Sequence, residues 1–239
     1  MCEPWNRVYV SPANFLPYGT KQVCKCYNAF MKSKTRKELS RPTGRPLSFD
    51  PDKALDRALD VFWRKGYEGA SLSDLTKAMR INRPSLYAAF GDKENLFHKV
   101  LDHYAEGPAS HSRAALQEPT SRAVVERLLY GTADMLSSDG NPRGCLWVQG
   151  ALACGSSADS VRKELISRRL GGEAALRQRL KRAITEGDLP PDANPASLAR
   201  YIAIIIQGMS VQAASGATRS QLRGIIDIAL ESWPSRRNT

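Results

Sequence analysis

The stretch that decides the fold reads GYEGASLSDLTKAM at Gly66–Met79 and INRPSLYAAFGDKENLF at Ile81–Phe97. Ser71 can cap a helix, and Asp74 follows three residues later, at the spacing of a capping box. From Ser71 onward, apolar residues recur at helical spacing. The pattern predicts a short helix that ends near Arg80.

This short helix has helical neighbours on both sides. Asp50 can cap a longer amphipathic helix that should end near Gly66, and another helix begins near Asp92. Between them, a turn at residues 80–82 leads to a second short helix over residues 83–90. Two short helices joined by a tight turn, behind a longer one, form the unit that places a recognition helix in the DNA major groove.

Helical patterns continue through the rest of the chain, and no segment alternates with the two-residue period of a strand. We therefore expect an all-α fold in three parts. These are a disordered basic N-terminal extension at 1–45, a three-helix helix-turn-helix DNA-binding domain at 46–97 and a helical ligand-binding and dimerisation domain at 98–239. The helices expected in the last part cover residues 121–137, 143–154, 157–186, 195–214 and 219–232.

The positive charge of the chain is concentrated at its N-terminus. The 239 residues carry a formal net charge of +11, and residues 1–49 hold nine Lys or Arg against two acidic residues, a net of +7. Such an excess favours a polyanionic partner, because Lys and Arg that neutralise phosphates release condensed counterions. A sequence-indifferent DNA binder is therefore an alternative to a specific regulator. It would use the basic arm formed by Lys32, Lys34, Arg36, Lys37, Arg41 and Arg45.

Two further hypotheses concern this N-terminal segment. TGRP at residues 43–46 would add a minor-groove or phosphate contact ahead of the first helix. Met31 begins the Lys-rich run, so the natural product would start at Met31 if the preceding residues belong to no element.

Several function classes find little support in the sequence. The longest apolar run, at residues 201–206, is far shorter than the ~18 residues of a membrane span, so we expect no membrane partner. An odd number of cysteines without a signal peptide indicates a reducing, cytoplasmic compartment. Cys24 and Cys26 lack nearby ligands to complete a zinc site, so we expect no metal and no cofactor. We expect no enzyme, because the histidines lack ligand spacing and a nucleophile partner. They are His98, His103 and His111.

The two quoted segments resemble the TetR family of repressors. The likeness covers residues 49–97 and rests on a Gly-aromatic turn after the first helix, a Ser cap, a Leu-Tyr pair, an aromatic residue three positions later and Lys-Glu-x-Leu. It implies a homodimer on a palindromic operator, with repression as the more common outcome. It also implies that bases are contacted by Arg83, Pro84, Ser85 and Ser73, and the DNA backbone by Ser71, Tyr87 and Lys93.

Three positions leave alternatives open. Arg80 stands where the family usually has Gly, so either the turn tolerates another residue or Arg80 contacts a phosphate. Tyr87 either contacts the DNA backbone or serves packing alone. Arg83 would otherwise be a solvated charge, but a cation is disfavoured at a helix N-terminus, and this favours a DNA role.

Two apolar stripes lie on the helices expected near 195–214 and 219–232. Two such helices per subunit can form a four-helix dimer interface, as the resemblance implies. The alternative is that both stripes pack only within the subunit. The stripes are Leu198, Tyr201, Ile202, Ile205 and Met209 on the first helix, and Leu222, Ile225, Ile226, Ala229 and Trp233 on the second.

The resemblance also implies a small-molecule effector held among the middle helices. Small residues leave room and aromatic rings offer a flat contact surface, although core packing explains the same residues. A bound effector would release DNA by favouring a dimer in which the reading heads no longer match successive major grooves, with residues 92–104 as the pivot. The candidate pocket residues are Tyr130, Met135, Cys145 and Trp147.

Overall fold

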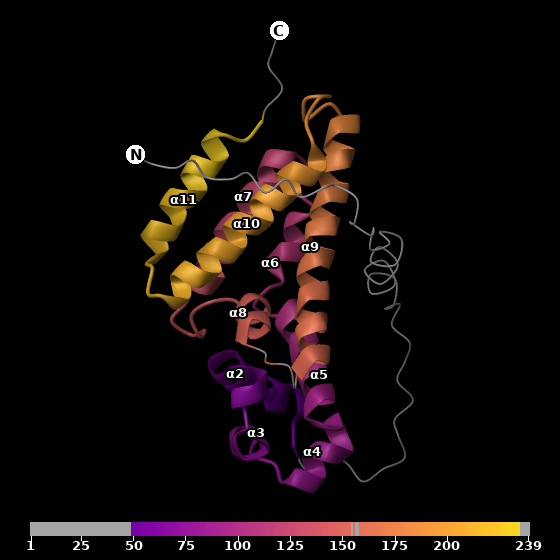
Figure 1. The fold of residues 1–239 in the computed structure, drawn as a ribbon, viewed down its shortest axis with the longest axis vertical. Coiled ribbons are helices and arrows are strands. Elements are labelled where there is room, and N and C mark those ends of the chain that lie inside the picture. The colour runs from indigo at the N-terminus through magenta and orange to yellow at the C-terminus, as the bar shows by residue number, and fades with distance from the viewer. Residues whose placement is uncertain (1–48, 154, 156–157, 235–239) are drawn as a thin grey trace, which may run out of the picture. The chain divides into compact units, whose positions relative to one another are not determined.

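The structure is a computed structural model that describes residues 49–153, 155 and 158–234, all within one compact unit. The hypotheses about the basic arm, TGRP, Met31, Cys24 and Cys26 concern residues outside these ranges. Every regular element in the described ranges is a helix, which confirms the all-α fold (Figure 1). The helices are α2 (Pro51–Gly69), α3 (Leu72–Met79), α4 (Arg83–Phe90), α5 (Lys93–Glu106), α6 (His111–Ala115), α7 (Ser121–Leu136), α8 (Leu146–Ala153), α9 (Asp159–Thr185), α10 (Pro195–Ala214) and α11 (Arg219–Glu231).

Helix α2 begins where its sequence predicts. The Asp50 side chain accepts hydrogen bonds from the backbone N–H groups of Asp52 and Lys53, and Pro51 occupies the first helical position. The regular helix breaks at Gly66, whose φ of 70° is open to glycine at little cost. One more helical turn follows before α3, so the predicted end near Gly66 marks a real kink.

An aromatic core holds α3, α4 and α5 against α2. The Phe62 ring meets the Phe97 ring edge-on at 4.8 Å between centroids, and the Tyr67 ring lies 5.1 Å from Phe97. Buried side chains of the two short helices complete this core. Packing of this kind, rather than helix propensity, stabilises helices of only eight residues. Those buried residues are Leu75 and Met79 of α3 and Leu86 and Phe90 of α4.

The chain forms one helix that its sequence did not reveal. Helix α6 spans His111–Ala115, between the break after α5 and the start of α7. Five residues are too few to display a helical period, and Ser110 makes no side-chain cap, so neither usual signal is present. Helix α8 begins three residues later than expected, because Gly144 takes a φ of 91°.

A buried junction connects α2 and α5 to α8. The indole Nε1–H of Trp63 donates a hydrogen bond of 2.8 Å to the backbone carbonyl of Gly144. The Trp63 ring packs edge-on against Tyr104 of α5, at 4.9 Å, and the other neighbour of Tyr104 is the ring of Trp147, at 5.2 Å. Three helices therefore share one aromatic cluster.

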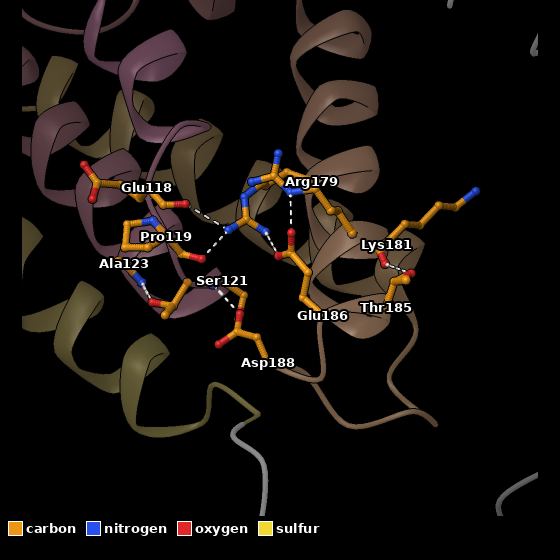
Figure 2. Close-up of polar contacts among 11 residues, drawn as sticks. Glu118, Pro119, Ser121, Ala123, Arg179, Lys181, Thr185, Glu186 and Asp188 are labelled. Atoms are coloured by element: carbon orange, nitrogen blue, oxygen red, sulfur yellow. Dashed lines mark hydrogen bonds and ion pairs between the residues drawn. The ribbon is translucent and has the colours of Figure 1, made fainter.

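A buried arginine attaches the segment before α7 to α9. Nη2 of Arg179 donates to the carbonyl oxygens of Glu118 at 2.8 Å and Pro119 at 2.9 Å (Figure 2). Beside it, a carboxylate oxygen of Asp188 accepts the first backbone N–H of α7, that of Ser121, at 2.5 Å. The Asp188 contact satisfies a backbone N–H that a helix start leaves without an intrahelical partner, and the Arg179 contacts satisfy two carbonyls of the loop before α7. They fix the start of α7 relative to α9.

None of the described helices is long and apolar enough to cross a membrane.

We expect Arg179→Met to lower the free energy of unfolding by about 1–2 kcal/mol, because the Glu118 and Pro119 carbonyls lose a charged donor. Urea unfolding followed by circular dichroism measures this change. Lys181→Met, an exposed cation on the same helix, is the control and should change stability by less than about 0.5 kcal/mol. Equal stability of both variants would show that the arginine contributes no net stabilisation.

Candidate nucleic-acid interface and effector site

The capping box of α3 is present as its sequence predicts. Ser71 Oγ accepts the backbone N–H of Asp74 at 3.0 Å, and a carboxylate oxygen of Asp74 accepts the backbone N–H of Ser71 at 3.1 Å. Lys65 of α2 pairs with the same carboxylate at 2.8 Å. Lys65 and the Ser71 hydroxyl hold the pKa of Asp74 well below its usual range. The Ser71 hydroxyl therefore already serves the helix start.

The turn between α3 and α4 places Arg80 in a left-handed conformation, with φ 58° and ψ 42°. Its N–H donates to the carbonyl of Lys77 and the N–H of Ile81 donates to that of Thr76, the pattern of a Schellman cap. The Arg57 guanidinium of α2 donates to the carbonyl of Met79, at the end of α3. This conformation costs a non-glycine residue roughly 1–2 kcal/mol, and among the described residues Arg80 alone adopts it without being glycine.

Helix α4 presents its first residues to solvent. The side chain of Asn82 caps the helix by accepting the N–H of Ser85 at 2.8 Å, which fixes the direction in which α4 leaves the turn. Arg83 and Pro84 are exposed and Ser85 is half-buried. Tyr87, one turn further, is 48% exposed, so core packing does not account for this tyrosine.

Lys93 occupies the first position of α5. Its ammonium group lies 4.5 Å from the centre of the Tyr67 ring, a cation–π arrangement. Burial lowers the pKa of Lys93, and the carboxylate of Glu68 opposes the change. Tyr67 and Glu68 therefore hold the lysine at the junction of α2 and α5, and the structure places it next to the end of α4.

Charge along this part of the chain is uneven. From Ser71 to Lys93 there are four basic and two acidic residues. Both acidic side chains are helix caps, Asp74 for α3 and Asp92 for α5, where its carboxylate accepts the N–H of Asn95 at 2.8 Å. Neither Arg80 nor Arg83 forms an ion pair with a described residue. The acids thus stabilise helix starts and leave the cations available for an anionic partner.

Two contributors to this surface escaped the sequence analysis. Lys77 is exposed on α3, four residues after Ser73 and three before Arg80, a spacing that places all three on one side of the helix. That spacing was the available signal. Arg57 donates from α2 to the carbonyl of Met79 at 3.3 Å and so supports the turn. No local pattern pointed to Arg57, since the two residues lie 22 positions apart.

The structure gathers three of the four candidate pocket residues. The Tyr104 hydroxyl lies 3.3 Å from both Met135 Sδ and Cys145 Sγ, and the Tyr104 ring contacts Trp147. Tyr130 lies elsewhere, where its hydroxyl donates to Asp227 of α11. There, Tyr130 borders an open surface hollow together with Arg223 and Asp227. The sequence signal missed Tyr104 as the centre of the group.

An exposed helix start behind a capped turn, set on a rigid aromatic core, defines a helix-turn-helix DNA-binding regulator. Comparisons with known proteins specify the class. A family model described as bacterial regulatory proteins of the tetR family matches residues 54–100, and one described as a tetracyclin repressor-like C-terminal domain matches residues 122–227.

Individual relatives agree over most of the chain. The HTH-type transcriptional repressor ComR of Escherichia coli K12 is 34% identical over 198 residues, which cover 82% of this chain and 94% of ComR. A structure of a cysteine mutant of the TetR family regulator CifR, complexed with 26 bp double-strand operator DNA, is 44% identical. Its TM-score is 0.76, covering 80% of this chain and all of that one. A putative TetR regulator from Rhodococcus sp. RHA1 is 38% identical, with a TM-score of 0.55 and coverage of 76% and 98%. The chain belongs to the TetR family of bacterial regulatory proteins.

We expect Arg80→Gly to raise the free energy of unfolding by about 1 kcal/mol, because glycine adopts the left-handed turn without steric cost, although it adds entropy to the unfolded chain. Thermal and urea unfolding measure the gain. Arg80→Ala, which removes the charge but keeps the strain, is the matched control for operator affinity. Stronger DNA binding by Arg80→Gly than by the native protein would exclude a phosphate contact by Arg80.

Proposed function

We propose that this chain is a homodimeric transcriptional repressor that binds a palindromic operator and leaves it when a small-molecule effector binds. The observation that carries the proposal is the start of α4, where Arg83 and Pro84 stand exposed on a capped recognition helix. ComR is named as a repressor, and CifR was solved in complex with its operator. Both names support the same function for the present chain.

In this proposal the start of α4 reads bases. A major groove ~12 Å wide admits one helix, whose N-terminal residues then meet base edges. The Arg83 guanidinium can donate two hydrogen bonds to a guanine, and Pro84 and Ser85 lie beside it, with Ser73 reaching across from α3. Tyr87 and Lys93 hold phosphates and so fix the register. The remaining phosphate contacts come from Lys77 and Arg80, and from Ser71 when its hydroxyl proton turns from Asp74 to the DNA.

The dimer forms through the outer faces of α10 and α11. Inner members of the two apolar stripes, such as Ile202, Met209 and Ile226, are buried within the protomer. Ile204 on α10 and Ile228 on α11 are instead 60% and 64% exposed. Clustered exposed apolar residues mark an interaction surface. Most of the exposed large apolar side chains among the described residues lie on these two helices: Tyr201, Ile204, Val211, Ile225 and Ile228.

Two mid-helix glycines support the same surface. Gly208 follows Ile204 by one turn on α10, and Gly224 precedes Ile228 by one turn on α11. A Cβ at either glycine would meet nothing within 4 Å in the protomer. Glycine inside a helix costs about 1 kcal/mol relative to alanine, and packing within the protomer does not require it here. A partner helix lying close to the backbone would require it.

The junction around Tyr104 couples an effector to DNA release. Trp63 belongs to the helix that carries α3 and α4, and its indole is hydrogen-bonded to Gly144, next to the candidate pocket residue Cys145. A ligand that shifts Cys145 or Trp147 would therefore move α2 and α5 together. Spacing between the two recognition helices of the dimer would change, while successive major grooves stay ~34 Å apart.

Selection of bound sequences from a random duplex library tests the reading role. We expect a palindrome for the native protein, and a loss of preference at one position of each half-site for Arg83→Ala, worth about 1–3 kcal/mol. Tyr87→Ala should weaken all recovered sites to a similar extent, since a phosphate contact carries no sequence information.

The alternative of a general polyanion binder gives a different result in this selection. No sequence would be enriched, and affinity would follow the charge of residues 32–45 when its Lys and Arg are neutralised. That pattern would reject the specific repressor.

Ile204→Glu combined with Ile228→Glu should convert the dimer to a monomer, because two charges per protomer would have to be buried without partners. Sedimentation velocity measures the mass, and operator affinity should fall by at least tenfold. Gln178→Glu, an exposed charge on α9, is the control and should stay dimeric. A double variant that remains dimeric would place the interface elsewhere.

A further inference from the structure

Six buried side-chain nitrogens of the described residues lack a hydrogen-bond partner, and two of them concern the cluster around Tyr104. Trp147 Nε1 on α8 and Arg169 Nε on α9 are buried atoms without a hydrogen-bond partner. Buried polar groups nearly always have partners, so each exception calls for a physical explanation. Both residues are half-buried as a whole, so other atoms of the two side chains reach solvent.

The Tyr104 cluster beside Trp147 offers weak acceptors or acceptors that already have a donor. The Tyr104 hydroxyl, itself fully buried, donates only to the sulfur atoms of Met135 and Cys145, and sulfur is a weak acceptor. Burial raises the pKa of Tyr104 and of Cys145, so both groups keep their protons and remain donors. Two acceptors of the cluster already have a donor: the Gly144 carbonyl accepts from Trp63, and the Ser210 hydroxyl oxygen accepts the N–H of Cys145.

Arg169 adds a positive charge without a matching acid. Arg168, its neighbour on α9, pairs with Asp102 at 2.9 Å and with Glu164 at 2.7 Å. Arg169 forms no ion pair with any residue of the described ranges. Its charge reaches the cluster, because it opposes the rise that burial causes in the pKa of Cys145. Packing of α8 on α9, where Gly150 meets Leu165, brings Trp147 and Arg169 to the same stretch of the two helices.

We propose that Arg169 and Trp147 bind the carboxylate of a small organic acid, which is the effector. The guanidinium supplies charge and N–H donors to the carboxylate, and the Trp147 indole supplies one further N–H. The apolar part of the acid lies against the ring of Trp147. This inference rests on the proposed function for the effect of the acid on DNA, but its binding does not.

A water molecule explains the site less well than an anion. One water would satisfy the indole of Trp147, but it would leave the charge of Arg169 uncompensated in a partly buried position. A neutral ligand would likewise leave the charge of Arg169 uncompensated. A carboxylate supplies both the acceptor oxygens and the opposite charge, so acids should bind better than amides of the same shape.

Thermal unfolding of the full chain without DNA tests the proposal. The probes are benzoate and hexanoate, with benzamide and hexanamide as neutral counterparts of the same shape. At saturating acid we expect a rise of about 2–4 °C in Tm for the native protein and none with the amides. Arg169→Met should abolish the rise with acids, and Trp147→Phe, which keeps a ring but removes the N–H, should reduce it.

Arg162→Met is the matched control. Arg162 is an exposed arginine of α9 that pairs with Asp159, so its loss should leave the response to acids unchanged. Without ligand, Arg169→Met should be as stable as the native protein, because an unpaired charge is replaced by an apolar side chain of similar length. A marked loss of stability would instead assign Arg169 a structural role. Equal shifts with acids and amides, no shift with either acid, or a full acid shift in Arg169→Met would each overturn the proposal.

A second readout separates this inference from the proposed function. The operator duplex recovered by selection is titrated with each acid and amide in an anisotropy assay. Acid-dependent Tm shifts without loss of DNA binding would retain the acid site and reject its role as the effector site. Loss of DNA binding with acids alone, abolished by Arg169→Met, would support both.

Discussion

The hydrogen bond from the Trp63 indole to the Gly144 carbonyl is the contact on which the arrangement of the two halves depends. A buried N–H must find an acceptor or cost the full penalty of desolvation, so Trp63 ties α2 to the segment before α8. Glycine suits position 144 for two reasons: a side chain would have no room there, and the backbone has a positive φ. A Cβ there would lie 2.0 Å from Nε2 of Gln149, and its φ of 91° is strained for any other residue. The rings of Tyr104 and Trp147 then pack edge-on, one after the other, from this fixed point.

The acidic residues of the helix-turn-helix unit affect the DNA-facing surface because they serve as helix caps and do not lie on that surface. The helix-turn-helix unit has few acids beyond α2, and those at Asp74 and Asp92 accept backbone N–H groups at helix starts. A carboxylate at a helix N-terminus is stabilised by the helix dipole. The same carboxylate on the outer face of α4 would repel phosphate. Local capping and long-range electrostatics therefore favour the same placement.

Sequence reasoning succeeded where local chemistry decides the outcome. Caps at Asp50 and Ser71 fixed the starts of two helices, and the missing glycine correctly marked the turn at Arg80 as unusual. It failed where the partners are distant in the chain. Helix α6 has no period long enough to detect, and Tyr130 pairs with Asp227, 97 residues away. The charge of Arg169 stands out only because the structure shows Arg168 to be paired, which no spacing reveals.

Hydrogen–deuterium exchange of the Trp63 indole N–H also measures how readily its contact with Gly144 opens. A proton that is buried and bonded to a carbonyl exchanges with deuterium only when the contact opens. Its exchange rate therefore reports the free-energy difference between the state in which this hydrogen bond connects α2 to the segment before α8 and the state in which the bond is broken. An effector that tightens the joint would slow the exchange, and one that loosens it would speed the exchange, so the sign of the coupling can be read at a single atom without any DNA present.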